Sequence, residues 1–583
     1  MNAAAVDDGS HGPAPRGFGA IATVVLLVAA AGSKWLAFLP PEWPLATICW
    51  LALFSIAAVS ARAARVLLVG AFVVDLAWWL LVQRWIVDVS VAGYPVLCVY
   101  LALWSVPLAW LLRRLAIRPA TARVPLWIAL PTIVVALDVL RGEFVFGGYP
   151  WYEAGQGVAA GTAGWIEVAQ VADLLGARGL SILAALAAGA IAESVRTRAP
   201  GTSMRWRFAG LPVAAAVWIA AFAYGHWRLE QAEDHSPLGR FLAIQTALPI
   251  DNKIGWSAAR QLEDVPAFAE ATRRAVEQAG PPIDLVAWPE TMLPGFGLDP
   301  TTLDMLERGG FFPGRLFDEI VHAVARGAAA PLLVGSPAYV GLRADGARWT
   351  WESHYNSVYL VPVVRSPGDP EPPRYDKMVL TPFGETMPGI SRFEALENAL
   401  LDIGARGMSF DLDAGTVPVR FEIETSRGEP VRLATPICFE ATVASLCRRL
   451  VWSDGERAVD LLVNASNDGW LGDDLAARRM HLRLASLRAI ENRTPMLRAV
   501  NTGYSAGIDS SGRIVAGLDG SSKRLGTSEG WVLAELHRDT RRPLFAVVGD
   551  RWAWFAVVAG VIGCWASRRR RSERPSDSIR DGA

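Results

Sequence analysis

Residues 431–440 read VRLATPICFE, an apolar run that closes with a proline, a cysteine and a glutamate. Val431 to Pro436 has the length and composition of a buried β-strand, and Ala441 to Val451 has the spacing of a helix. Cys438 is therefore expected at a strand-to-helix elbow, where α/β folds present catalytic groups. The segment predicts an α/β domain with a thiol at the edge of a sheet.

The same pattern extends on both sides of this segment, from about residue 228 to about residue 545. Two stretches have helical spacing, Leu262 to Glu277 and Leu482 to Glu491. Such alternation of helices and strands predicts sheets sandwiched between helices, in a domain of about 315 residues that is long enough to bury its own core. The further runs that read as buried strands are Phe241 to Gln245, Leu285 to Trp288, Pro331 to Gly335, Ser357 to Val363 and Leu461 to Ala465.

The composition excludes several classes of protein. Of the 583 residues, 52% are hydrophobic and only 19% are charged, which is too little charge to cover a purely water-soluble protein. The formal charge of -1 offers no net attraction to a nucleic-acid backbone, so no nucleic-acid partner is expected. The five cysteines are too few and too scattered for a disulfide framework, and no CxxC or HExxH spacing suits zinc. The sequence implies neither a metal ion nor an organic cofactor.

The hydrophobic residues are concentrated in runs near the ~20 residues that a membrane-spanning helix needs. A cleaved signal peptide is the alternative for the first run, which follows Arg16, but the further runs favour an uncleaved anchor. The sequence predicts a multi-pass α-helical membrane domain of about eight spans, joined to an extramembrane α/β domain. The predicted spans are residues 18–39, 44–60, 66–83, 91–112, 124–140, 178–193, 208–225 and 551–566.

Arginines alternate between the loops of this membrane domain. They are concentrated after the second, fourth and sixth predicted spans, at residues 62–65, 113–123 and 196–207. Because positively charged loops stay on the cytoplasmic side, both termini are expected in the cytoplasm and the α/β domain on the periplasmic side of a bacterial inner membrane. The predicted organisation is a disordered cytoplasmic N-terminus (1–17), seven membrane helices (18–227), a catalytic domain (228–545), an eighth helix (546–567) and a basic cytoplasmic tail (568–583).

Three segments of the α/β domain place a reactive side chain just after an apolar strand. Glu290 ends VAWPE, Lys377 ends YDK, and Cys438 follows the strand described above. A nearby lysine and a following helix N-terminus are expected to stabilise the thiolate of Cys438, while Glu290 takes up its proton and Lys377 stabilises an oxyanion. Taken singly, such a cysteine is more often core, such a glutamate a helix cap and such a lysine solvated.

Taken together, the three segments resemble the nitrilase superfamily, whose Glu, Lys and Cys triad occurs in this order. With seven predicted spans before the domain and one after it, the chain is similar to one membrane-embedded branch of that superfamily, the apolipoprotein N-acyltransferase family. The resemblance covers nearly the whole chain and implies an αββα sandwich for the α/β domain. Further marks of it are LRG at 140–142, GYPW at 148–151, NDGW at 467–470, RAIENR at 488–493 and NTG at 501–503.

The resemblance implies roles for the matching residues. Glu290 is expected to be the general base, Lys377 the oxyanion stabiliser and Cys438 the acyl-accepting nucleophile. Glu385 and Glu440 match two supporting acidic positions and are expected to position Lys377 or the incoming amine. A structural salt bridge is the alternative for both glutamates.

Other positions carry weaker expectations. Trp256 is expected beside the active site, and Arg141 is expected either to meet a lipid phosphate or to snorkel at the outer interface. Residues 299–327 are long between superfamily strands; they are expected to form a membrane-facing arm, with a buried helix as the equal alternative. Phe439 and Asp376 depart from the family, which often has Tyr and Asn there, but neither departure removes a catalytic group.

The resemblance implies a two-step acyl transfer with ping-pong kinetics. The expected donor is a phospholipid, with phosphatidylethanolamine the first candidate, and the acceptor is the α-amino group of the N-terminal S-diacylglyceryl-cysteine of an apolipoprotein. Two alternatives stay open: a membrane-tethered amidase or nitrilase-type hydrolase, in which water resolves the thioester, and a catalytically silent lipoprotein-binding scaffold. The sequence leaves the oligomeric state open and is compatible with a monomer.

Overall fold

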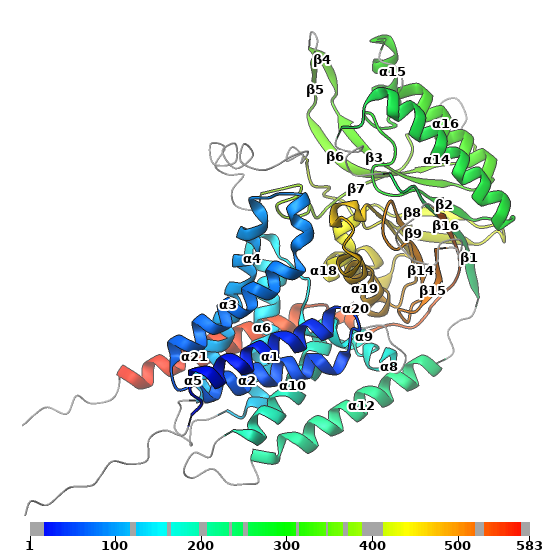
Figure 1. Ribbon diagram of the computed structural model, residues 1–583. Coiled ribbons are helices and arrows are strands. Elements are labelled where there is room, and N and C mark those ends of the chain that lie inside the picture. Colours follow the sequence, from blue (N-terminus) through cyan, green and yellow to red (C-terminus); the bar gives the residue numbers. More distant parts are fainter. Residues whose placement is uncertain are drawn as a thin grey trace, which may run out of the picture.

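The computed structural model consists of a bundle of membrane helices and an α/β domain that packs on one end of the bundle (Figure 1). It describes residues 17–116, 124–159, 165–196, 207–231, 236–248, 255–310, 314–345, 348–364, 371–387, 412–518 and 530–572. The termini that the sequence predicts to be disordered, before residue 17 and after residue 572, lie outside the described residues.

Helices occupy all eight of the apolar runs. Among the described residues, five helical stretches are long and apolar enough to cross a membrane: α1, α3, α4 together with α5, α10 and α12. The helical membrane domain is therefore confirmed, while the count of eight spans stays a prediction. The helices are α1 (Ala20–Phe38), α2 (Pro44–Ser60), α3 (Ala64–Val82), α4 (Gly93–Leu103), α5 (Ser105–Ala116), α6 (Leu126–Val139), α10 (Ala177–Val195), α12 (Gly210–Glu230) and, after the α/β domain, α21 (Arg551–Ser572).

Short helical turns fill the end of the bundle that faces the α/β domain. The π-helical turn η3 (Leu140–Phe144) prolongs α6, and the backbone then folds back on itself at Gly148, whose φ is 89°. A Cβ at this position would stand 2.2 Å from the carbonyl oxygen of Gly142, so only glycine fits the turn. The other turns are η1 (Arg84–Asp88), η4 (Val145–Gly147), α7 (Ala154–Val158), α8 (Ile166–Ala169) and α9 (Ala172–Leu175).

The α/β domain contains two six-stranded sheets. Its long strands follow the predicted apolar runs, because a strand buried on both faces is apolar throughout. The first sheet has the order β16 (Gly530–His537), β1 (Pro237–Gln245), β2 (Leu285–Ala287), β3 (Leu332–Val340), β6 (Ser353–Val361) and β7 (Arg374–Asp376). The second has the order β15 (Ile514–Gly517), β14 (Ala506–Ile508), β13 (Met496–Val500), β12 (Leu461–Ser466), β9 (Pro430–Ala434) and β8 (Phe421–Glu424).

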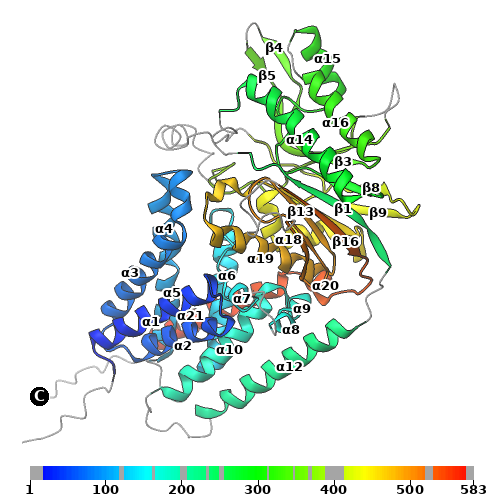
Figure 2. The same cartoon turned by 45° about the vertical axis from the view of Figure 1, so that its right-hand side comes forward.

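The two sheets face each other across a common hydrophobic core and are covered by helices on their outer faces (Figure 2). Helices α14 (Ala258–Ala279) and α16 (Gly314–Ala328) cover the first sheet, and α18 (Ala444–Val451) and α19 (Leu475–Asn492) cover the second. This is the αββα sandwich that the sequence resemblance implies. The remaining elements are two small hairpins, β4 (Arg343–Asp345) with β5 (Arg348–Thr350) and β10 (Trp452–Ser453) with β11 (Glu456–Arg457), and the short helix α20 (Leu544–Val548).

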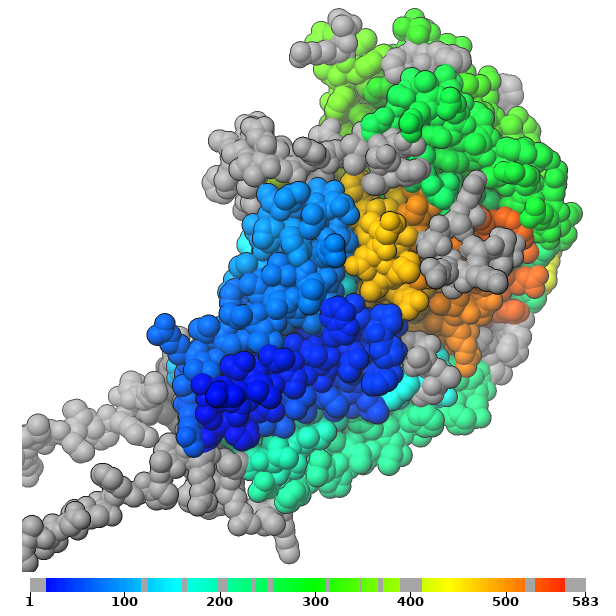
Figure 3. Space-filling view, viewed as in Figure 1, coloured from blue at the N-terminus to red at the C-terminus, as the bar shows by residue number. Residues whose placement is uncertain are grey.

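Helix α19 belongs to two cores at once. Leu482 and Ala485 pack toward the second sheet, whereas Met480 and Leu484 pack into the core of the membrane domain. The space-filling view accordingly shows the gold segment, which contains α18 and α19, directly against the blue membrane helices (Figure 3). Since one face of α19 needs the membrane domain for its burial, the two domains form one packed unit.

Residues 299–327 do not form a membrane-facing arm. They fold into α15 (Pro300–Arg308) and most of α16, and Phe317 and Val321 of α16 are 1% and 0% exposed in the core of the first sheet. Both views place α15 and α16 on the side of the sandwich that lies away from the membrane helices (Figures 1 and 2). The alternative of a buried helix is therefore correct for the described part of this segment; Phe311, Phe312 and Pro313 lie outside it.

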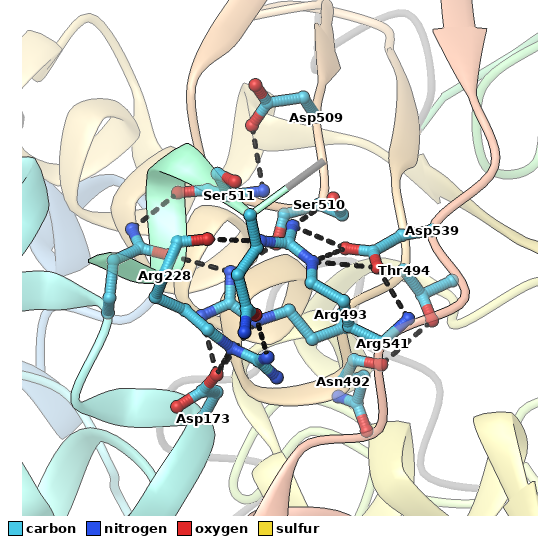
Figure 4. A network of polar contacts seen from close by, with 12 residues as sticks. Asp173, Arg228, Asn492, Arg493, Thr494, Asp509, Ser510, Ser511, Asp539 and Arg541 are labelled. Carbon is cyan, nitrogen blue, oxygen red and sulfur yellow. Dashed lines mark hydrogen bonds and ion pairs between the residues drawn. The ribbon is translucent and has the colours of Figure 1, made fainter. Parts of the chain in front are cut away.

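A buried ionic cluster joins the two domains at the C-terminal end of α19. Asp173 of α9 accepts hydrogen bonds from Arg493, which ends α19, at 2.6 Å and from Arg228 of α12 at 2.7 Å (Figure 4). The side chains of Asp173 and Arg493 are both 0% exposed. Asp173 thereby connects α9 and α12 of the membrane domain to the C-terminal end of α19.

Candidate active site

The Cys438 elbow forms where the sequence predicts it, at the end of the strand β9. Asn464 of β12 holds the segment from the side by donating to the carbonyl oxygen of Pro436 at 2.8 Å. The chain then turns through the short 3-10 helix η5 (Cys438–Thr442) before α18 begins, and Cys438 itself has a φ of 49°. A non-glycine residue adopts this left-handed conformation only where its surroundings impose it. The elbow therefore aims the thiol at the cost of local backbone strain.

Glu290 lies just beyond β2 and is 4% exposed. Its Oε1 accepts a hydrogen bond from Nδ2 of Asn356 at 2.7 Å and lies 3.5 Å from Nζ of Lys377. The first and second sequence segments thus meet at the same edge of the first sheet, because β2 and β7 both end there. A buried carboxylate beside an ammonium can accept a proton from a neighbouring group.

Lys377 is buried as an ion pair. Its Nζ lies 2.6 Å from Oε2 and 2.9 Å from Oε1 of Glu385, and the residue is 1% exposed. Burial by itself would lower the pKa of Lys377, but the carboxylates of Glu385 and Glu290 outweigh burial and raise it. The same pair lowers the pKa of Glu385, although burial opposes this. The two carboxylates therefore favour the charged form of Lys377, which is the form that can stabilise an oxyanion.

Glu440 connects the Lys377 segment to the Cys438 elbow. Its carboxylate accepts hydrogen bonds from the backbone N–H groups of Met378 at 2.6 Å, Val379 at 2.9 Å and Ile437 at 2.7 Å, and from the hydroxyl of Tyr375. Burial raises the pKa of Glu440 to about 7. Glu440 therefore holds the residues after Lys377 against the residue before Cys438, and its supporting role in catalysis stays a prediction.

The neighbours of Cys438 shift the pKa of its thiol in opposite directions. Burial raises the pKa of the thiol to about 12, and the negative charge of Glu290 adds to this, while Lys377 acts in the opposite direction. The expected helix N-terminus is only a 3-10 turn, so the dipole of α18 does not begin at the thiol. Cys438 is partly exposed, and the raised pKa of its thiol opposes the expected thiolate, whereas Lys377 favours it; the stabilised thiolate stays a prediction. Such a thiol needs a base at the moment of attack.

Asn356 is a site residue that the sequence interpretation missed. Its Nδ2 donates to Glu290 at 2.7 Å and to Glu385 at 3.1 Å, and its backbone carbonyl accepts from the N–H of Lys377 at 2.9 Å. It thus touches three of the predicted site residues. The predicted strand began at Ser357, four residues after β6 begins at Ser353, and so left Asn356 out; an amide inside the apolar strand β6 was the available signal, since a buried amide needs polar partners.

The structure gives local contacts for the two residues with weaker expectations, Trp256 and Arg141. Trp256 lies at the start of α14, where its indole N–H donates to Asp264 at 2.7 Å. Arg141 is 6% exposed in η3, with its guanidinium 5.7 Å from the ring of Trp79, and it lines a cavity inside the membrane domain. A substrate role for either residue stays a prediction.

The active-site loop touches the membrane domain. Phe383, two residues before Glu385, is 43% exposed and has a φ of 59°. Its ring packs edge-on against Phe146 of the membrane domain, with the centroids 6.1 Å apart. The Lys377 to Glu385 segment therefore lies at the junction of the two domains.

Comparison with known proteins agrees with this arrangement in both domains. Residues 30–190 match the family described as "Apolipoprotein N-acyltransferase N-terminal domain", and residues 253–541 match the family "Carbon-nitrogen hydrolase". The first match covers most of the membrane helices, and the second covers the segments that contain Glu290, Lys377 and Cys438.

Curated relatives match over most of their length. The apolipoprotein N-acyltransferase of Bordetella bronchiseptica is 30% identical over 592 residues, which cover 94% of this chain and 97% of the relative. That of Geobacter metallireducens is 30% identical over 83% of this chain and 82% of its own length. That of Caulobacter vibrioides is 34% identical over 77% of this chain and 73% of its own.

Proposed function

Since this chain belongs to the apolipoprotein N-acyltransferase family, we propose that it acylates apolipoproteins through a thioester on Cys438, with Glu290 and Lys377 as its catalytic partners. The protein is a membrane-bound N-acyltransferase. One observation supports this choice of residues. Oε1 of Glu290 lies 3.5 Å from Nζ of Lys377, and the charges of both groups shift the pKa of the Cys438 thiol.

The first half-reaction loads the enzyme. Glu290 takes the proton of the Cys438 thiol, and the sulfur attacks the ester carbonyl of a phospholipid, for which phosphatidylethanolamine is the proposed donor. The Lys377 ammonium stabilises the tetrahedral oxyanion. The C–O bond then breaks, the leaving oxygen takes the proton from Glu290, and a lysophospholipid departs. An acyl thioester remains on Cys438.

The second half-reaction transfers the acyl chain to the apolipoprotein. Glu290 takes a proton from the α-ammonium of the N-terminal S-diacylglyceryl-cysteine, and the free amine attacks the thioester carbonyl. The C–N bond forms and the C–S bond breaks; one proton returns to the sulfur and a second is released to solvent. Because the lysophospholipid leaves before the acceptor reacts, the kinetics are ping-pong.

The membrane domain suits substrates that carry acyl chains. Extracting a lipid chain from the bilayer costs about 0.8 kcal/mol for each CH₂ group, so a site that opens at the membrane avoids this cost. The contact between Phe383 and Phe146 supports entry from the membrane side. We further propose that the catalytic domain (228–545) lies on the periplasmic face of the inner membrane, between seven helices and an eighth, with both termini in the cytoplasm.

The test is mass spectrometry of the detergent-purified protein incubated with phosphatidylethanolamine. An acyl mass on the Cys438 peptide is expected, which hydroxylamine removes and a diacylglyceryl-cysteine peptide discharges with formation of an amide. The adduct should be absent from Cys438→Ala and present in Cys447→Ala, a control that removes a buried cysteine of the same domain.

Two results contradict the proposal. The absence of an adduct and of product peptide in the wild-type protein is incompatible with the acyl-enzyme. An adduct that decays only to free fatty acid in the presence of the acceptor peptide identifies a hydrolase instead.

A further inference from the structure

His481 lies directly behind the nucleophile. It belongs to α19 and is 3% exposed, and its Nε2 lies 3.3 Å from the backbone carbonyl oxygen of Cys438. Because a carbonyl oxygen only accepts, the contact is a hydrogen bond when Nε2 carries the proton. His481 has no role in the two half-reactions proposed above, although it contacts Cys438, the residue that reacts.

The other ring nitrogen of His481 has a fixed polar environment. Nδ1 lies 2.9 Å from Oδ1 of Asp468 and 3.1 Å from Nη2 of Arg498. A neutral ring accepts at Nδ1 from Arg498, and a charged ring donates there to Asp468. Nε2 carries a proton in both of these forms and donates to Cys438; the carbonyl oxygen, which only accepts, disfavours the other neutral form, in which Nδ1 alone is protonated.

Asp468 and Arg498 are themselves firmly held. Arg498 donates to Asp468 at 2.7 Å and to Asn464 at 2.6 Å, and both members of the ion pair are 0% exposed. Asn464 also holds the elbow at Pro436. The histidine is therefore anchored to the same strand, β12, that supports the nucleophile from the side.

The membrane domain closes the remaining face of the imidazole. The ring of Trp151 lies 5.6 Å from that of His481, and Trp151 is 5% exposed. Trp151 ends the GYPW segment and packs against Tyr149, whose hydroxyl accepts a hydrogen bond from Gln83 of the membrane domain. His481 is thus enclosed between the α/β domain and the helical bundle.

We propose that His481 is a positioning residue for the acylation of Cys438: its imidazole holds the carbonyl group of the nucleophile, and Trp151 of the membrane domain holds the imidazole. The left-handed backbone at Cys438, with a φ of 49°, must be imposed by its surroundings. A hydrogen bond to the carbonyl oxygen of Cys438 is one way in which a neighbour can impose it. Release of that carbonyl lets the elbow relax and moves the sulfur away from Glu290. The inference rests on the proposed thioester at Cys438.

The experiment compares His481→Gln with His481→Asn in the full-length protein in detergent. The amide of glutamine reaches the place of Nε2, whereas that of asparagine reaches only the place of Nδ1. The rate constant of thioester formation on Cys438 at saturating phosphatidylethanolamine, and the KM for that lipid, are measured by quenched-reaction mass spectrometry. The unfolding temperature of each variant is recorded alongside.

We expect His481→Asn to lower the rate constant about 10- to 100-fold with an unchanged KM, because a displacement of about 1 Å is enough for such a loss. His481→Gln should retain the rate to within about fivefold of wild type. Trp151→Leu, which leaves the histidine in place, should lower the same rate constant without raising KM. His322→Asn and His322→Gln are the matched controls, since His322 is also buried and lies 3.5 Å from an aspartate, Asp318, but in the outer helix α16.

Three outcomes overturn the inference while the proposed function stands: a wild-type rate in His481→Asn, a loss confined to KM, or an equal loss in the Asn and Gln variants. If His481→Asn does not fold, the comparison of His481→Gln with Trp151→Leu decides, and a wild-type rate in Trp151→Leu overturns the inference. A wild-type protein that forms no thioester overturns both the inference and the proposed function.

Discussion

Gly335 of β3 lies directly against the backbone of Glu290. A Cβ added to Gly335 would stand 2.7 Å from the Cα of Glu290 and 2.5 Å from the carbonyl oxygen of Pro289. The carbonyl oxygen of Gly335 also accepts a hydrogen bond from the N–H of Leu293 at 3.0 Å. The loop that carries the proposed base therefore lies directly on β3, with no space for a side chain between them. Because residue 335 is a glycine, Glu290 can occupy its observed position.

Gly335→Ala should displace Glu290 and lower the rate of thioester formation about 10- to 100-fold, since the clash is with backbone that cannot turn aside. The matched control is Gly327→Ala in α16, where an added Cβ meets nothing within 4 Å. That variant should keep full activity and be as stable as wild type or up to about 1 kcal/mol more stable. Single-turnover kinetics and thermal unfolding measure both effects. Full activity of Gly335→Ala would contradict the argument.

Asn356→Leu should lower the acylation rate by about tenfold or more, because it removes the donor that fixes Oε1 of Glu290 and leaves the carboxylates of Glu290 and Glu385 with fewer hydrogen bonds. Tyr355→Phe, on the neighbouring residue of the same strand, should keep the rate within about twofold. The rate constant of thioester formation distinguishes them. Equal activity of the two variants would show that Asn356 does not hold the base.

Alkylation of Cys438 should respond to its two charged neighbours in opposite directions. Glu290 raises the pKa of the thiol and Lys377 lowers it, so Glu290→Gln should speed the reaction with iodoacetamide at pH 8 and Lys377→Met should slow it. In the wild-type protein the alkylation rate should still be rising at pH 10, because the pKa is about 12. Peptide mass spectrometry follows the modification.

Both variants should nevertheless lose acyl transfer. Faster alkylation with slower transfer in Glu290→Gln separates the basicity of the thiol from catalysis by the carboxylate. Slower alkylation in Glu290→Gln would contradict the electrostatic description of the site.

Glu385→Gln should destabilise the protein by about 3 kcal/mol at pH 7, because it leaves the buried Lys377 ammonium without its nearest counter-charge. The pKa of Glu385 is lowered in the folded protein, so the contribution of its ionised form is present above the unfolded pKa of about 4.3 and is lost as the pH falls through the folded value. The difference in unfolding temperature between wild type and variant should therefore shrink between pH 5 and pH 3. A difference that is constant with pH would argue against an ionic role.

Asp173→Asn should weaken the junction of the two domains, since it leaves Arg493 and Arg228 with a neutral partner in a buried cluster (Figure 4). Breaking a buried ion pair costs about 3–5 kcal/mol, and a marked fall in unfolding temperature is expected. Glu270→Gln, which removes an exposed partner of Arg273, is the control and should change nothing measurable. Equal unfolding temperatures for the two variants would show that the cluster does not hold the domains together.

The two-part architecture could be predicted because its signals are local. A run of about 20 apolar residues is a property of consecutive positions, and so is the alternation of short apolar strands with helical spacing. Glu290, Lys377 and Cys438 could be named for a related reason: each follows its strand within a few residues, and the edge of a sheet brings such positions together. Local patterns could not decide whether residues 299–327 form a membrane-facing arm or a buried helix, because aromatic residues at this spacing are compatible with both.

What the sequence by itself determined is therefore which segments form the helical membrane domain, which form the sandwich, and which residues are chemically able to react. Only the tertiary structure decided how those residues behave. Asn356 and His481 act through partners far away in the chain, and the pKa of the Cys438 thiol is raised because the fold withdraws it from water beside Glu290. Burial and through-space contact depend on the folded arrangement of all the segments at once, and no short stretch of sequence contains them.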